Sequence, residues 1–454
     1  MPADLWGNAV SEGSRAALAA IDAFAGGLVA YEARAATILA AAEADATHPL
    51  VATWAGVLTL LGEHEAAVQA ARPWLAAAEA GLDRANPRER RHFVALRAWI
   101  DGAIDEAILE LETLVAEYPR DLTALKLLHY HLFNRGDFPG LLRTAELAVA
   151  AAPELAYVHG MAAFGYEQLH LLDEAEAAAR RALSIEPREP WAQHALAHVM
   201  LTEGRIDEGI GFLETARPGW TRLNSFMLTH LWWHLALFYL SAGREADALA
   251  AYDDQVWAVA KDYSQDQIGA VSLLARLEMG GVAVGARWQD LGTHLAARKT
   301  DVVQPFLSVQ YLYGLARAGR EEADALLDAI AAAAADKERQ DRLVWQQVAL
   351  PLAQGLVAHA RGGFAAAAEQ LADVLPRLIR LGGSHAQRDL FEIVLLDARI
   401  RSGDFVEAQQ MLALRRAHDP DGVPLNRSLA AVYRALGLPA LADAADARVR
   451  ARLP

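Results

Sequence analysis

The chain has 454 residues, 54% of them hydrophobic and only 7% aromatic, and its formal net charge is −16. The lack of cysteine excludes disulfides, zinc–thiolate sites, iron–sulfur clusters and thiol catalysis. The acidic charge weighs against nucleic acid and anionic membranes as partners, because both require a basic surface. No apolar run is long enough to span a membrane and no signal peptide is recognisable, so we expect a cytoplasmic protein.

Residues 1–87 are expected to form amino-terminal helices and a first degenerate repeat. A helical pair near 48–81 keeps small residues at Ala55, Gly62 and Ala67, and a linker around Pro87 follows it. Abundant alanine with few aromatic residues favours closely packed helices over sheets.

A period of 34 residues organises the segment 88–267. Pro119, Pro153 and Pro187 lie 34 residues apart, and Gly102 and Gly136 repeat the interval. Such a period, with a proline closing each unit, is typical of stacked helix–turn–helix repeats. We predict that two helices form in each of four units, which span residues 88–121, 122–155, 156–189 and 190–223.

Small residues mark the predicted contact between the two helices of a unit, because they let the backbones approach closely. Ala197 faces Gly209 in the fourth unit, whereas the second unit has His129 and Leu141 at these positions. Either that helical pair packs differently or the repeat register shifts there.

A fifth unit begins near Thr229, after a longer connection around Pro218 and Trp220. Residues 268–454 are predicted to form degenerate repeats and a carboxy-terminal cap, with turns between helices at Gly319, Gly362, Gly403 and Gly437. The predicted fold is an all-α, tetratricopeptide-like right-handed solenoid, regular in the middle and degenerate at both ends.

Several longer stretches carry a more specific pattern. They are residues 157–168, 194–199, 230–237, 261–266 and 383–389. With these stretches the chain resembles the tetratricopeptide repeat protein 38 family over nearly its whole length. The resemblance implies an all-helical solenoid and no particular activity.

The first helix of each tetratricopeptide unit lines the concave surface of the solenoid. The predicted groove residues are aromatic, imidazole or charged: His92, Lys126, Tyr130, Tyr157, Glu167, Trp191, His194, His198, His230 and Trp233. Tyr157, Trp191 and Trp233 beside the histidines suggest an aromatic cage able to hold a cation or a planar ring. Ser384 is expected to cap a helix, with Arg388 paired across the solenoid. If the superhelix curls far enough, Arg388 instead closes the far side of the pocket as an anion clamp.

The histidine spacing suggests a metal site. His194 and His198 lie one helical turn apart, so their imidazoles can share an ion, and His230 adds another from the next unit. Glu167 offers an oxygen ligand, and this donor set suits Zn, Fe, Mn or Ni. Structural histidines bonded to their neighbours are the alternative, so no cofactor is predicted beyond this candidate divalent metal.

Three functions remain open from the sequence. The first is a binding protein whose concave pocket of His, Trp, Tyr and Glu holds a small polar ligand or a peptide segment. The second is an enzyme that uses His194, His198, Glu167 or Asp266 in acid–base or metal-assisted chemistry. The third is a general protein–protein interaction scaffold.

Overall fold

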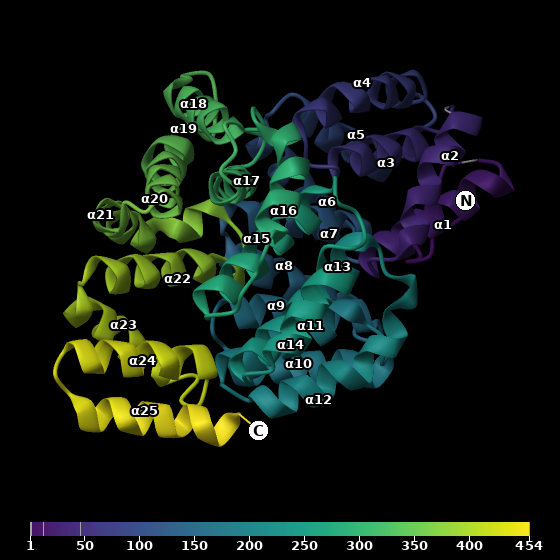
Figure 1. Ribbon diagram of the computed structural model, residues 1–454. Coiled ribbons are helices and arrows are strands. Elements are labelled where there is room, and N and C mark those ends of the chain that lie inside the picture. The colour runs from purple at the N-terminus through teal and green to yellow at the C-terminus, as the bar shows by residue number, and fades with distance from the viewer. Residues whose placement is uncertain (1, 12, 46, 454) are drawn as a thin grey trace. The chain divides into compact units, whose positions relative to one another are not determined.

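The computed structural model describes residues 2–11, 13–45 and 47–453, and helices dominate it (Figure 1). Within these residues, β-type pairing is confined to two isolated bridges, Ala3 with Ala9 and Glu32 with Leu223. A search of the same residues finds no helix with the length and apolar character needed to cross a membrane.

The chain divides into two compact units. Unit 1 comprises Met1–Leu196 and Gly219–Met227, and unit 2 comprises Ala197–Pro218 and Leu228–Pro454. These boundaries differ from the three predicted segments, which follow the regularity of the repeats rather than compactness.

The helices of unit 1 follow one another in short-linked pairs: α1 (Arg15–Val29), η1 (Ala33–Ala36), α2 (Thr37–Ala44), α3 (Pro49–Leu60), α4 (Glu65–Ala80), α5 (Pro87–Ile100), α6 (Ile104–Glu117), α7 (Leu122–Arg135), α8 (Phe138–Ala151), α9 (Ala156–Gln168) and α10 (Leu172–Ile185). Three elements contain residues of both units: α11 (Pro190–Thr202), η2 (Arg217–Arg222) and α13 (Ser225–Ser241).

Unit 2 continues the same alternation: α12 (Ile206–Ala216), α14 (Glu245–Ala251), η3 (Tyr252–Val256), α15 (Ser264–Met279), α16 (Arg287–Leu295), η4 (Ala296–Arg298), α17 (Pro305–Arg317), α18 (Glu322–Ala335), α19 (Arg342–Val344), η5 (Trp345–Ala349), α20 (Leu350–Ala360), α21 (Phe364–Val374), η6 (Leu375–Leu381), α22 (His385–Ser402), α23 (Phe405–Arg416), α24 (Val423–Ala435) and α25 (Pro439–Arg452).

The predicted all-α repeat architecture is confirmed. The four regular units are the pairs α5–α6, α7–α8, α9–α10 and α11–α12, and their first helices begin at or within one residue of the predicted unit starts. Gly136 ends α7 in the left-handed region at φ 70°, a conformation that favours glycine because a side chain strains it. The fifth unit begins earlier than predicted, because α13 starts at Ser225 and η2 forms the longer connection.

The unusual contact positions of the second unit reflect different packing rather than a register shift. Helices α7 and α8 keep the repeat interval, and His129 Nε2 lies 3.1 Å from Thr144 Oγ1 on α8. In the fourth unit, a methyl group at Gly209 would collide with the ring of Phe238. Gly209 therefore also makes room for the first helix of the following unit.

A buried ionic network anchors the amino-terminal segment to unit 1. Arg88 Nη1 donates to Asp4 Oδ2 at 2.9 Å and to Asp121 Oδ2 at 2.8 Å, and all three side chains are buried. His92 Nε2 lies 2.8 Å from the same oxygen of Asp121. The segment before α1 is thereby tied to α5 and to the start of α7.

Unit 2 folds back on itself, so that its last helices contact its first ones. Ser241 at the end of α13 donates to Asp419 Oδ2 at 2.5 Å, just before α24. Arg452 at the end of α25 donates to Asp207 Oδ2 at 2.8 Å, on α12. These contacts hold α24 and α25, coloured yellow in Figure 1, to the beginning of the unit.

Candidate functional site

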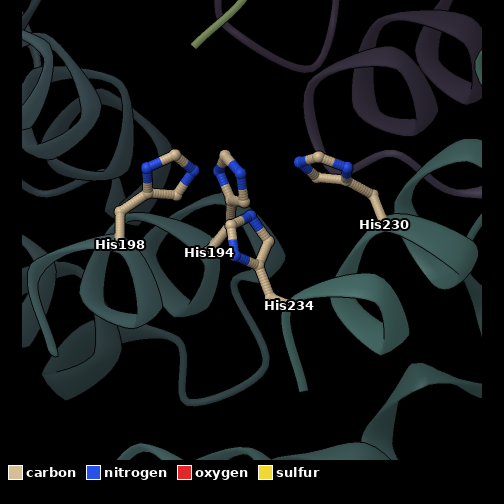
Figure 2. A group of neighbouring side chains, drawn as sticks. All are labelled: His194, His198, His230 and His234. Atoms are coloured by element: carbon tan, nitrogen blue, oxygen red, sulfur yellow. The ribbon is translucent and has the colours of Figure 1, made fainter. Parts of the chain in front are cut away.

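Three buried histidines converge inside unit 2. His198 lies on α11, and His230 and His234 lie one turn apart on α13 (Figure 2). The ring centroids of His198 and His234 are 4.5 Å apart, and those of His230 and His234 are 4.8 Å apart. One nitrogen of each ring lies within 4.8 Å of a nitrogen of the other two. We call these residues the histidine cluster.

Burial keeps the imidazoles of His230 and His234 neutral. The pKa of His230 is lowered to about 3, mainly by burial and in addition by the charge that His198 would carry. Burial and the same neighbour, together with His230, hold the pKa of His234 well below its usual range. Neutral imidazole has a free lone pair on one nitrogen, which is the form that coordinates a metal ion.

Helices from later in unit 2 border the histidine cluster. His385, the first residue of α22, places its ring 5.3 Å from that of His198, edge to face. Arg276 on α15 donates to Ala386 O at 2.8 Å, and its guanidinium lies 5.4 Å from the ring centroid of Trp233. The segment containing His385, Ala386 and Arg388 thus reaches the central units, a point that the sequence left open.

Trp233 stacks on the histidine cluster. Its ring is nearly parallel to that of His230, with centroids 5.3 Å apart and an interplanar angle of 7°. The indole Nε1–H is buried and has no acceptor among the described residues. An N–H in that state is ready to donate to an added water or ligand oxygen.

An aromatic cage forms in unit 1, and the chain fills it with its own lysine. Lys126 Nζ on α7 lies 4.0 Å from the ring centroid of Tyr31 and 4.3 Å from that of Trp191. The two rings stack with centroids 5.1 Å apart. His194 in turn stacks on Trp191 at 4.5 Å. Lys126, Trp191 and His194, each predicted separately as a groove residue, thus lie together with Tyr31.

Glu189 supplies the negative charge beside this cage. Its carboxylate accepts the backbone N–H of Trp191 at 3.1 Å and that of Ala192. A methyl group at Gly160 would collide with the carboxylate, so glycine leaves the space that Glu189 occupies. Burial lowers the pKa of Lys126 to about 7 against the opposing charge of Glu189, and burial raises the pKa of Glu189.

The sequence did not identify Tyr31 or Glu189. Tyr31 precedes the repeats and belongs to no periodic pattern. Glu189 stands directly before Pro190 at the start of α11, where an acidic side chain commonly accepts the first free N–H groups of a helix. Glu189 could therefore have been predicted from its position directly before a proline that begins a helix.

Other predicted groove residues have partners within unit 1. His92 belongs to the network of Asp121, and Tyr130 donates to Glu63 Oε1 at 3.0 Å. Tyr157 packs against the edge of Trp6 with centroids 5.8 Å apart. Their predicted ligand contacts stay predictions.

Four further predicted residues, Glu167, Asp266, Ser384 and Arg388, have the following contacts. Glu167 is fully buried in unit 1 and accepts from Gln168 at 2.6 Å. Asp266 accepts from Thr229 Oγ1 at 3.1 Å and from Ala260 N at 3.2 Å. Arg388 donates to the carbonyl of Gly383, and Ser384 caps α22 as predicted.

The structure buries two histidines that the sequence placed on an exposed concave surface. His194 is 1% exposed and His198 is fully buried. The two lie one turn apart on α11, as expected, and Figure 2 shows both. An open groove along these residues is therefore not the observed arrangement.

No protein-family model matches the chain. Among solved structures, the human IFIT1 dimer with m7Gppp-AAAA is similar at 14% identity, covering 89% of this chain and 90% of that one, with a TM-score of 0.36. The structure of Naa15/Naa10 bound to HypK-THB is similar at 14% identity, covering 81% and 64%, with a TM-score of 0.25. These scores are too low to transfer a fold or a function.

Proposed function

We propose that the protein binds a divalent transition-metal ion in unit 2, through His198, His230 and His234. The observation that carries this proposal is the convergence of three buried imidazoles from two helices, with their nitrogens within 4.8 Å of one another. Imidazole nitrogens at this spacing can coordinate one cation together.

The donor set selects the class of metal. Three imidazole nitrogens suit Zn²⁺, Ni²⁺, Co²⁺ or Cu²⁺, whereas Mg²⁺ and Ca²⁺ prefer oxygen ligands. Three protein ligands also leave the fourth position of a tetrahedral ion open. A donor atom of a small polar ligand can take that position, which unites the metal with the predicted ligand pocket.

One nearby charge opposes a bound cation. Arg276 lies beside the histidine cluster, and burial lowers its pKa to about 10 without removing its charge near neutral pH. Asp389 Oδ2 lies 3.6 Å from Arg276 Nη2, and Asp389 also pairs with Arg415. Because the arginine charge is shared with a carboxylate, the histidine cluster does not face a bare guanidinium.

Titration of the metal-free, untagged protein tests the proposal. We expect one equivalent of Zn²⁺ or Ni²⁺ to bind by calorimetry and to remain through gel filtration, as measured by elemental analysis. His198→Ala and His234→Ala should each weaken binding at least about 100-fold, because a three-ligand site loses a third of its donors.

The matched control is His418→Ala, which removes an exposed histidine of the same unit. It should bind the metal like the parent protein. Zn²⁺ affinity weaker than about 10 μM in the parent protein, or equal affinity in all three variants, would overturn the metal proposal.

A further inference from the structure

Lysine is rare in this chain, and one lysine is buried. The sequence contains four lysines and 38 arginines among its 42 basic residues. Lys261, Lys299 and Lys337 are partly or fully exposed, whereas Lys126 is 9% exposed. Arginine stays protonated even when buried, but a lysine amine can lose its proton there. Of these two basic residue types, lysine is the one whose side chain can become a nucleophile, and a lysine occupies this buried position.

Lys126 is surrounded by aromatic rings, with the charge of Glu189 acting on it as well. Among the described residues, Nζ takes part in no hydrogen bond or ion pair, and it lies 4.0 Å from the ring centroid of Tyr31 and 4.3 Å from that of Trp191. Phe226 packs on Tyr31 at 5.7 Å and Phe164 on Trp191 at 4.6 Å, which extends the apolar wall. The rings and Glu189 attract an ammonium ion, but burial deprives it of water, and burial is the larger effect, so the pKa of Lys126 falls to about 7.

Tyr31 is held in a strained backbone conformation to make this wall. Its φ is +53°, in the left-handed region that a bulky residue rarely adopts. The carbonyl of Tyr31 accepts the N–H of Asn224 at 2.6 Å, and the next residue, Glu32, forms a bridge with Leu223. Strain retained by such surrounding contacts is concentrated at functional sites in proteins.

We propose that Lys126 is a nucleophilic amine that forms an imine with an aromatic aldehyde seated against Tyr31 and Trp191. The nitrogen lone pair attacks the carbonyl carbon, and the resulting carbinolamine loses its hydroxyl group with a proton as water. Amine and aldehyde thus become imine and water, with no change of oxidation state. The planar rings of Tyr31 and Trp191 favour a planar, aromatic carbonyl compound over an aliphatic one.

An anion clamp is the alternative use of a lysine, and the site favours it less. A clamp requires the ammonium form, whereas burial lowers the pKa of Lys126. The carboxylate of Glu189, whose charge acts on Lys126, would also repel an incoming anion. Both features act against anion capture and in favour of the uncharged amine.

The experiment measures imine formation at all four lysines of the same molecule. The full-length protein is incubated with benzaldehyde at pH 7, the imine is reduced with sodium borohydride, and benzylated lysines are quantified by peptide mass mapping. An alkyl amine in water is almost wholly protonated at this pH. We expect labelling at Lys126 to exceed that at Lys261, Lys299 and Lys337 at least about 10-fold.

The ratio within one molecule makes the result independent of how any variant folds. Raising the pH to 10 should lower the ratio of labelling at Lys126 to labelling at the other lysines, because the neutral fraction of an amine in water rises steeply toward that pH. Trp191→Leu should lower the preference for benzaldehyde over acetaldehyde, since one aromatic face is lost.

Labelling of Lys126 equal to or weaker than that of the exposed lysines at pH 7 would overturn the proposal. Protection of Lys126 by inorganic phosphate, with no imine formed, would point to the anion clamp and equally overturn it. The measurement is made with a chelator present, so that it does not depend on the metal proposed for unit 2.

Discussion

The lysine cage of unit 1 and the histidine cluster of unit 2 bury basic nitrogen in opposite ways. In the lysine cage a single amine, Lys126, is enclosed by aromatic faces and has one carboxylate near it. In the histidine cluster, His198, His230 and His234 direct their rings toward one another. Both surroundings remove water and favour neutral bases.

The lysine cage and the histidine cluster differ in the chemistry that their nitrogen atoms can perform. A solitary amine beside flat rings has one lone pair and a planar surface, which suits attack on a carbonyl group. Converging imidazoles present several lone pairs to one point, which suits coordination of a cation. The same repeat architecture thus supports two kinds of chemistry, depending on whether successive helices contribute aromatic rings or further bases.

The largest expected effect is metal stabilisation confined to unit 2. Zn²⁺ at 100 times its dissociation constant should raise the free energy of unfolding by about 2.7 kcal/mol. For a body of this size that corresponds to a rise of about 5–10 °C in the melting temperature, measured by calorimetry. His230→Ala should lose the rise and Lys126→Met should keep it. An equal rise in both variants would contradict the assignment to the histidine cluster.

The second expected effect tests whether the cage excludes a permanent charge. Lys126→Arg places a cation that cannot lose its proton between Tyr31 and Trp191, and should lower the free energy of unfolding by about 2 kcal/mol or more. Lys126→Met keeps the length of the side chain but removes its charge, and should change the free energy of unfolding by less than about 1 kcal/mol. Urea unfolding measures both, and equal tolerance of arginine and methionine would show that the cage accepts a charge.

A third effect concerns pH and the histidines near the cage. Burial lowers the pKa of His129 and of His131 to about 3. As the pH falls below about 6.5, the unfolded chain takes up protons that the folded chain refuses. Stability present above that pH is therefore lost between about 6.5 and 3, by up to about 1.4 kcal/mol per pH unit for each histidine.

His131→Leu separates this contribution from the rest. His131 packs edge-on against Trp99 at 4.6 Å, so leucine preserves an apolar contact there. The free energy of unfolding, measured with urea between pH 7 and 5, should fall less steeply with falling pH in His131→Leu than in the parent protein. The difference in slope should equal the contribution of one histidine. An unchanged slope would mean that His131 does not titrate on unfolding.

Local spacing predicted the fold because the repeat signal is local. Pro119, Pro153 and Pro187 mark units whose helices form where expected, and each glycine turn depends only on its neighbours in the chain. The same spacing placed His194 and His198 on one face of a helix.

The sites themselves depend on contacts between distant segments. Tyr31 reaches Lys126 from a segment before the repeats, through a left-handed backbone that no local pattern encodes. His385 reaches His198 only because unit 2 folds back on itself. Burial was also misjudged for His198, since spacing identifies the face of a helix but not what later covers it.

The smallest expected effect separates a structural histidine from the histidine cluster within unit 2. His359 Nδ1 lies 3.1 Å from the Tyr313 hydroxyl, and its Nε2 lies 2.8 Å from Asp397 Oδ2. Both ring nitrogens thus have a partner, which fixes the ring and leaves no lone pair for a metal ion. Tyr313→Phe removes one hydrogen bond and should cost about 1 kcal/mol in urea unfolding. Zn²⁺ affinity measured by calorimetry should stay unchanged, because this histidine makes no part of the proposed site. A loss of metal affinity in Tyr313→Phe would show instead that the binding of metal depends on the wider fold of unit 2 and not on the three converging imidazoles alone.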